Sequence, residues 1–353
     1  MASLERPLVS FTLLGCNQEN YIREAIEGAL SQTYSPLEII LSDDCSNDRT
    51  FEVMKEMTKA YNGPHKIVLN RNQKNLGCGN HVSLVMDMAQ GELIVRADGD
   101  DISLPERTMA LTEAWLKAGR PAGVGSEVIT INELGETIGL KCKTFSTSGY
   151  KPGVIPAPEL IRLFLQERPL GLVGCCAAWS KANWKLFGRF ADGVQQEDTV
   201  SSFRGFLHGG LNSISQELVK YRAHELNASF SICHKQSTRS SLSIHKSQAL
   251  SVAKAAKRRH AEFMTIRNDI ATAKKKLGLD PKSVKDLENV IDRRIDTLAI
   301  RKEWWNHGFF RRLQYWNHSP YSPWHQRISS LFGLNGFVLI RYIVVQIKTL
   351  RSK

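Results

Sequence analysis

The stretch that decides the fold is residues 8–50, which read LVSFTLLGCNQENYIREAIEGALSQTYSPLEIILSDDCSNDRT. The apolar runs at 8–14 and 37–41 have the length and composition of buried strands. Between them, residues 21–32 carry apolar side chains at helical spacing. The stretch therefore predicts a strand, a helix and a second strand, with an acidic loop directly after the second strand.

The same alternation continues to residue 97, with helices expected at 51–61 and 82–89 and strands at 66–70 and 93–97. This order predicts an α/β fold, in which helices flank a mostly parallel sheet and ligands bind at the carboxyl ends of the strands. The chain has no GxGxxG or GxxxxGK[ST] loop in this region, which argues against a dinucleotide oxidoreductase or a P-loop enzyme.

Charge is distributed unevenly along the 353 residues, a length that suggests about two structural units. Residues 233–353 hold 24 basic and 8 acidic side chains, whereas residues 1–232 hold 23 basic and 27 acidic. We expect three segments: an α/β domain at 1–232, a basic extension at 233–303 with helices at 248–277 and 283–303, and an aromatic-rich amphipathic segment at 304–353. A basic tail of this kind favours contact with an anionic partner, either nucleic acid or a membrane surface.

The seven cysteines form no CxxC pair and no disulfide framework. The sequence also lacks a secretion signal and any run of about 20 apolar residues, the length that a membrane-spanning helix needs. These features predict a cytoplasmic protein.

Two acidic loops follow predicted strands. Residues 98–101 read DGDD, and such a cluster is costly unless a cation such as Mg²⁺ or Mn²⁺ neutralises it. The alternative is an acidic turn in which Asp101 or Ser103 caps the next helix. The loop at 43–48 allows the same alternative, with Asn47 or Asp48 as the cap.

Eight short runs, in order, resemble glycosyltransferase family 2, whose fold is called GT-A. They are NQENYIREAI at 17–26, LSQTY at 30–34, EIILSDDCSNDRT at 38–50, NLG at 75–77, QGE at 90–92, DGDDISLPER at 98–107, ED at 197–198 and YRAHELNAS at 221–229. The resemblance covers roughly residues 7–230. It implies a GT-A domain that takes a nucleotide sugar as donor.

Position by position, the resemblance implies a donor site. Asp44 corresponds to the aspartate that receives the nucleotide base, and Glu19 lines the same pocket. Asp98 belongs to the DxD pair that holds the ribose and metal. Leu14 and Cys16 stand where the family has a Pro-Thr-Tyr or Pro-Val-Tyr loop that touches the nucleotide, so this loop is altered here and the resemblance leaves the identity of the base open.

The resemblance also implies a metal and a catalytic pair. Asp100 would bind Mn²⁺ or Mg²⁺ directly, and His224 would close the metal site; otherwise His224 is a surface loop histidine. Asp198 would be the general base, with Glu197 in support; without its context this pair is only a helix start. No Gln-x-x-Arg-Trp element follows the pair, which favours addition of a single sugar.

The resemblance thus implies an inverting glycosyltransferase whose donor is a nucleotide sugar, with a UDP sugar favoured. It also implies a saccharide or lipid-linked saccharide as acceptor, in surface polysaccharide or glycolipid synthesis. The alternatives are a metal-dependent nucleotidyltransferase and a nucleic-acid-binding protein, although no nucleic-acid-binding signature is present.

Two further segments carry expectations of their own. Residues 141–158 read as a long loop and a candidate lid. The aromatic residues at 304–324 and the apolar stretch at 328–350 favour a peripheral contact with the inner face of an anionic membrane. The alternative is that this segment packs on the α/β domain or forms a dimer contact.

Overall fold

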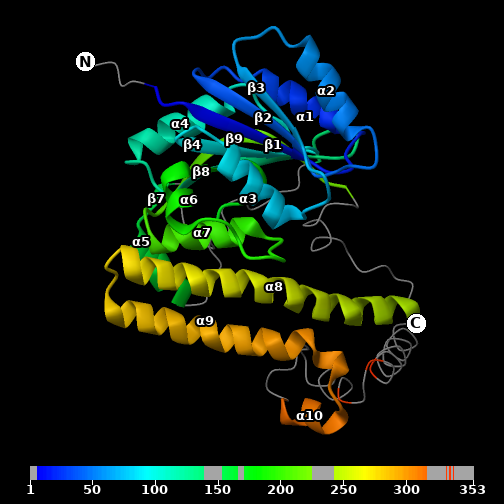
Figure 1. The fold of residues 1–353 in the computed structure, drawn as a ribbon, viewed down its shortest axis with the longest axis vertical. Coiled ribbons are helices and arrows are strands. Elements are labelled where there is room, and N and C mark those ends of the chain that lie inside the picture. Colours follow the sequence, from blue (N-terminus) through cyan, green and yellow to red (C-terminus); the bar gives the residue numbers. More distant parts are fainter. Residues whose placement is uncertain are drawn as a thin grey trace.

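The computed structural model describes residues 6–138, 153–165, 171–224 and 242–315, together with Leu331, Leu334 and Phe337. A mixed sheet forms the centre of the α/β part, with helices on both faces (Figure 1). Its strands are β1 (Val9–Gly15), β2 (Leu37–Asp43), β3 (Lys66–Arg71), β4 (Leu93–Asp98), β5 (Ile102–Ser103), β6 (Gly123–Ile131), β7 (Gly153–Ile155), β8 (Ala177–Ser180) and β9 (Leu211–Arg222).

The strands lie in the order β3-β2-β1-β4-β8-β6-β9-β5, and β7 pairs with β9. The first four strands are parallel, whereas β8 runs antiparallel to both β4 and β6. In the register, Gly15 pairs with Asp43 and Leu14 with Asp98. Three strands therefore end side by side, which places the acidic loops after β2 and β4 at one edge of the sheet.

The described helices are α1 (Ile22–Leu30), α2 (Thr50–Ala60), α3 (Cys78–Met88), α4 (Arg107–Lys117), α5 (Ala157–Leu165), α6 (Lys181–Phe187), α7 (Glu197–Leu207), α8 (Leu242–Lys276), α9 (Pro281–Lys302) and α10 (Phe309–Gln314), with short 3₁₀ turns at Gly174–Cys176 and Trp304–Asn306. The α8 and α9 helices form an antiparallel hairpin below the α/β part in Figure 1, and α7 lies between this hairpin and the sheet.

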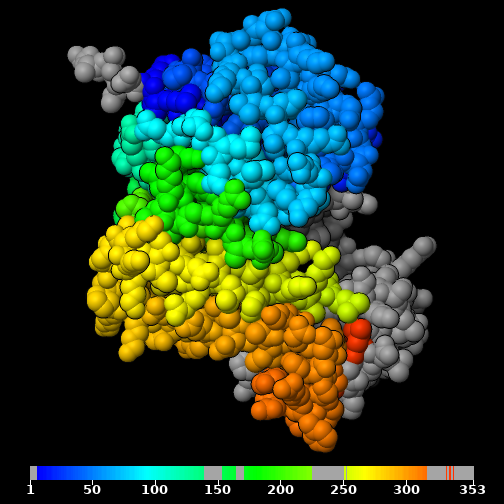
Figure 2. Space-filling model, in the orientation of Figure 1, coloured from blue at the N-terminus to red at the C-terminus, as the bar shows by residue number. Residues whose placement is uncertain are grey.

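Alternation along the strands divides the core into two layers, because successive side chains of a strand point to opposite faces. Phe11 and Leu13 of β1 face α1, α2 and α4. Leu14 faces the other layer, which continues through α3, α5, α6 and α7 into Ile270 of α8 and Ile291 of α9. The hairpin thus shares one hydrophobic core with the sheet. In Figure 2 the surface of α8, in yellow, lies directly against the surface of α5–α7, in green.

The predicted α/β class with a mostly parallel, helix-flanked sheet is confirmed, and the first seven elements end within a few residues of their predicted bounds. Helix capping by Asp101 or Ser103 is wrong: the cap of α4 is Glu106, because Ser103 lies in β5 and Asp101 accepts a hydrogen bond from the backbone of Arg222 (2.9 Å). Asp48 does bind the start of α2, accepting from the Thr50 amide at 3.0 Å.

The predicted loop at 141–158 lies mostly outside the described residues. Its last part is not a loop, because β7 pairs antiparallel with β9 and α5 begins at Ala157. That pairing joins residues almost sixty positions apart in sequence, so no local pattern announces it.

Candidate active site

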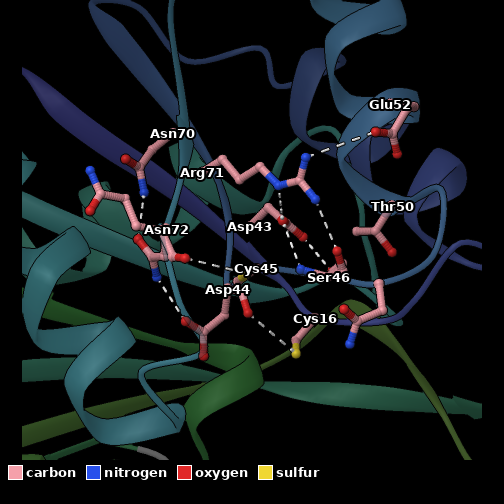
Figure 3. Close-up of polar contacts among 12 residues, drawn as sticks. Cys16, Asp43, Asp44, Cys45, Ser46, Thr50, Glu52, Asn70, Arg71 and Asn72 are labelled. Atoms are coloured by element: carbon pink, nitrogen blue, oxygen red, sulfur yellow. Dashed lines mark hydrogen bonds and ion pairs between the residues drawn. The ribbon is translucent and has the colours of Figure 1, made fainter.

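Asp44 organises the loop that follows β2 (Figure 3). Its side chain is only 3% exposed. One carboxylate oxygen accepts from the Asn72 amide group and from the Leu76 backbone, both at 2.8 Å, and the other accepts from the Gly77 backbone at 3.0 Å. The carboxylate therefore fixes the 75–77 turn beside the end of β2, where the resemblance expects the nucleotide base.

Cys16 lies beside Asp44 at the end of β1. Asn75 Nδ2 is 3.3 Å from its sulfur, and the Asp44 carbonyl oxygen is 3.9 Å away. Burial, followed by the charges of Asp44 and Asp43, raises the pKa of the Cys16 thiol, so the group stays neutral at neutral pH. A small neutral thiol thus stands where the family usually has a large aromatic ring.

Leu14 reaches this edge only through its backbone, because its side chain is part of the core. Its carbonyl oxygen accepts from the Gly99 amide at 2.8 Å. A Cβ on Gly99 would lie 2.5 Å from Gln18 Oε1 and 3.1 Å from the Leu14 oxygen. Glycine between the two aspartates therefore allows the acidic turn to approach β1 closely.

Glu19 lies at the outer side of the same edge. Its carboxylate accepts from the Arg49 amide (3.0 Å), while its own amide donates to Asp48 (3.0 Å). These two bonds join the loop after β1 to the start of α2.

Arg96 connects the acidic turn with the start of α7. Its guanidinium contacts Asp98 through two nitrogens (3.0 and 3.1 Å) and Glu197 at 3.0 Å. Burial raises the pKa of Asp98, Arg96 opposes this effect, and the charge of Asp100 adds to it. On the far side of Glu197, the Cys78 thiol donates to the second carboxylate oxygen (3.1 Å). Asp98 and Glu197 are thus held by one buried cation.

Asp100 and His224 meet although 124 positions separate them in sequence. The distance from His224 Nε2 to Asp100 Oδ2 is 3.0 Å, and the imidazole packs on the Tyr21 ring with centroids 5.0 Å apart. Arg222 supports both residues, because its Nε donates to the Asp100 carbonyl (3.0 Å) and its guanidinium lies over Tyr21. His224 is therefore buried next to the acidic turn and is not a surface loop histidine.

Asp198 begins α7 at the same edge. One oxygen accepts from the Thr199 amide (2.7 Å), and the other accepts from the Gly174 amide (3.3 Å). Burial raises the pKa of Asp198 to about 6, the charge of Glu197 adds to this effect, and Arg96 opposes it. A carboxylate with this pKa is ionised at neutral pH and binds a proton more readily than an ordinary aspartate, as a general base requires.

The structure brings the predicted residues into adjoining groups: Asp44 with Cys16, Asp98 with Glu197 through Arg96, and Asp100 with His224. Sequence reasoning missed Arg96, Cys78 and Arg222. Arg96 left a signal, since it is a charge inside an otherwise apolar strand just before the acidic turn. Cys78 left none.

Asp100 and His224 could hold a divalent cation. Among the residues that the structure describes, no three His, Cys, Asp or Glu side chains form a ready metal site. Mg²⁺, however, commonly uses one or two protein ligands and completes its shell with substrate phosphates and water. The charge of Asp100 raises the pKa of Asp101 after burial has already done so, which shows an excess of negative charge that a cation would relieve. The donor set therefore fits such an ion.

Comparison with known proteins shows which class of enzyme this chain resembles. Residues 15–155 match the family model described as Glycosyl transferase family 2. EpsE of Bacillus subtilis, named as a glycosyltransferase, is 34% identical over 130 residues, which are 36% of this chain and 46% of EpsE. TuaG of the same species, named as a teichuronic acid biosynthesis glycosyltransferase, is 29% identical over 96 residues, 27% of this chain and 37% of TuaG.

The fold has a counterpart among solved structures. S. aureus TarS 1-349 in complex with UDP superposes with a TM-score of 0.53 at 13% identity, covering 98% of this chain and 92% of that one. The α/β part of this chain thus has the GT-A fold, and its residues 15–155 are similar to glycosyltransferase family 2. The matched segments span less than half of either relative's length.

The membrane contact predicted for residues 304–350 falls largely on the C-terminal segment of the chain. Residues 316–353, apart from Leu331, Leu334 and Phe337, lie outside the described residues, and so does most of the predicted membrane contact. In the parts of the chain that the structure describes, no helix combines the length and the apolar character needed to cross a bilayer. Trp304 was expected at a membrane surface, and this is wrong because its ring is buried against Phe337 and Ile300.

Proposed function

We propose that this chain is an inverting glycosyltransferase that moves one sugar from a nucleotide sugar, most simply a UDP sugar, to a hydroxyl acceptor. One observation carries the proposal: the Asp44 carboxylate, the Asp100–His224 pair and the Asp198 carboxylate lie along one edge of a GT-A sheet. Each supplies one requirement of the reaction, namely base binding, diphosphate binding and proton acceptance.

The donor would lie along the ends of β1, β2 and β4. The base would lie beside Asp44 and Cys16, and the diphosphate would point toward Asp100 and His224. These two residues would hold Mn²⁺ or Mg²⁺, which acts as a Lewis acid for the leaving diphosphate. The UDP complex of TarS supports a uridine donor only through the shared fold.

Asp198 would accept the proton of the acceptor hydroxyl as that oxygen attacks the sugar. Arg96 holds the neighbouring Glu197, and amides of Gly174 and Thr199 hold Asp198 itself, so the carboxylate is oriented before the acceptor arrives. Attack from the face opposite to the leaving group inverts the anomeric carbon, as in single-displacement glycosidases.

The acceptor is proposed from the name of a relative, and the location of the chain from its exposed basic side chains. The name of TuaG, a teichuronic acid biosynthesis glycosyltransferase, supports a saccharide acceptor in polysaccharide synthesis. The sequence resemblance adds a lipid-linked saccharide as an alternative form of that acceptor. The basic side chains exposed on α8, among them Lys254, Lys257 and Lys275, support a location in the cytoplasm with a peripheral contact to an anionic membrane. Flotation of the full chain with anionic but not with neutral vesicles checks this contact.

A panel of nucleotide sugars tests the activity, with release of nucleoside diphosphate measured in Mn²⁺ or Mg²⁺. We expect release with one or a few donors, loss of release in EDTA, and recovery when the ion is returned. Asp100→Asn should abolish turnover and weaken metal-dependent binding of the nucleoside diphosphate. Full activity in EDTA would remove the metal from the proposal, and release of pyrophosphate would instead show a nucleotidyltransferase.

A further inference from the structure

One face of α8 holds the segment that leads into α7. Glu262 accepts from the Gln196 amide (3.3 Å), Thr265 Oγ1 accepts from the Ala191 amide (3.2 Å), and Asp269 pairs with Arg204 (2.9 Å). Positions 262, 265 and 269 are three and four residues apart, so they share one side of the helix. The hairpin thus contacts the chain directly before and within the helix that begins with Glu197 and Asp198.

Glu262 occupies an unusual position on this face. It is 1% exposed, and its second oxygen, Oε2, is buried and has no hydrogen-bond partner among the described residues. Gln196 is the N-cap residue of α7, and its own side chain makes no capping bond. The acceptor for the backbone amide of this N-cap residue is therefore supplied by a residue 66 positions further along the chain.

Glu262 also belongs to the electrostatic surroundings of the catalytic pair. Its pKa is raised to about 7, chiefly by burial. The Gln196 amide and Arg259 on α8 oppose this rise, whereas the charges of Asp198 and Glu197 on α7 add to it. Interaction between two charges is mutual, so ionised Glu262 makes Asp198 a stronger base. Across the pair, Arg96 of β4 is the facing cation.

We infer that Glu262 is a positioning residue for the general base: through the Gln196 amide it holds the start of α7, and its buried carboxyl group lies next to the chain segment that carries Glu197 and Asp198. This inference rests on the proposed function, because it assigns to the hairpin a part in the same reaction. The face of α8 that carries Glu262 then supports the catalytic pair from outside the donor site.

Two substitutions separate position from charge. Glu262→Leu removes the acceptor, and we expect kcat to fall about 10-fold while the KM for the donor stays within about 2-fold, because a displaced base affects the chemical step and not donor binding. Glu262→Gln keeps an acceptor for the Gln196 amide and should retain most of kcat. The matched control is Glu288→Leu on α9, where the carboxylate pairs with Arg267 (3.2 Å), and it should leave kcat unchanged.

The pH profile of kcat reports whether the charge of Glu262 acts on the catalytic pair. A residue with a purely structural role would leave this profile unchanged. In the unsubstituted chain, kcat should rise in two steps, as Asp198 ionises near pH 6 and Glu262 near pH 7. Glu262→Gln should remove the upper step and leave the lower one. Identical profiles for the two proteins would overturn the electrostatic part of the inference.

Amide hydrogen exchange at Gln196–Asp198 gives a readout that needs no activity. Exchange there should accelerate in Glu262→Leu and stay unchanged in Glu288→Leu. Unchanged exchange, or a kcat equal to that of the unsubstituted chain, overturns the positioning role. If no nucleotide sugar is turned over by the unsubstituted chain, the proposed function fails, and the exchange rates alone then decide whether Glu262 holds α7.

Discussion

The donor edge, formed by the loops after β1, β2 and β4, and the α8–α9 hairpin are stabilised in different ways. At the donor edge, carboxylates accept hydrogen bonds from nearby backbone amides, as Asp43 does from Ser46 (3.0 Å) and Asp48 from Thr50 (3.0 Å). The hairpin instead docks mainly through buried apolar side chains and the buried ion pair Arg204–Asp269, and its hydrogen bonds to backbone amides join residues far apart in sequence. Only the first kind of interaction leaves a short motif in the sequence.

The family match covers residues 15–155 and includes neither α7 nor the hairpin. Loops that bind backbone amides need particular residues at particular positions. A docking face needs only apolar side chains at helical spacing, which many sequences satisfy. The hairpin nevertheless contacts the segment that carries the catalytic pair. A region without a recognisable sequence motif can therefore still matter for function in this molecule.

The largest effect should come from the docking face. Arg204→Met leaves Asp269 buried without its cation, and breaking a buried ion pair in this way costs about 3–5 kcal/mol. Arg204 also lies over the rings of Trp184, Phe187 and Phe190, so little solvent can replace it. Chemical denaturation should show this loss of stability. The double substitution with Asp269→Leu should recover part of it, and an unchanged midpoint in Arg204→Met would show that the pair does not hold the hairpin.

A smaller effect, seen in catalysis and not in stability, should come from Asp198→Asn at the catalytic edge. We expect kcat to fall by roughly 10² because a positioned base is lost, while donor binding persists since the donor loops are elsewhere. Steady-state kinetics with a separate measurement of donor affinity checks this result. Loss of donor binding with a normal rate per bound complex would contradict the assignment of Asp198.

Stability should depend on pH through Glu262. Its pKa is raised to about 7 from an ordinary value of 4.5, so the folded chain binds a proton that the unfolded chain releases. The contribution of Glu262 to the free energy of unfolding is therefore complete below pH 4.5 and is lost as the pH rises through 7. Glu262→Gln removes this dependence, and its melting temperature should exceed that of the unsubstituted chain at pH 8 more than at pH 5. An equal difference at the two pH values would show that Glu262 is ionised in the folded chain throughout this range.

The smallest effect should come from the far end of the hairpin. Asp280 caps α9 by accepting from the Ser283 amide (2.8 Å), and it is exposed to solvent. Asp280→Ala should lower the melting temperature slightly, since a cap is lost, and leave kcat unchanged because the site is remote from α7. A loss of activity as large as that of Glu262→Leu would show that the hairpin acts as a whole and not through its contact with α7.

Much of this protein is determined by its sequence alone. The alternation of apolar runs and helical spacing determines β1 to β4 with α1 to α3, because strand and helix periods are local properties. The acidic loops follow from the same pattern, since parallel strands end at a common edge and place Asp44 beside the turn that carries Asp98. The resemblance of short motifs then indicates the class of protein.

The tertiary structure alone decided the contacts between distant parts of the chain. Arg96 bridges Asp98 and Glu197, His224 meets Asp100, and Glu262 reaches the start of α7. None of these pairings has a fixed spacing in sequence, because each depends on how the helices pack on the two faces of the sheet. The electrostatic setting of Asp198 is decided in the same way, since burial and neighbouring charges exist only after the chain has folded.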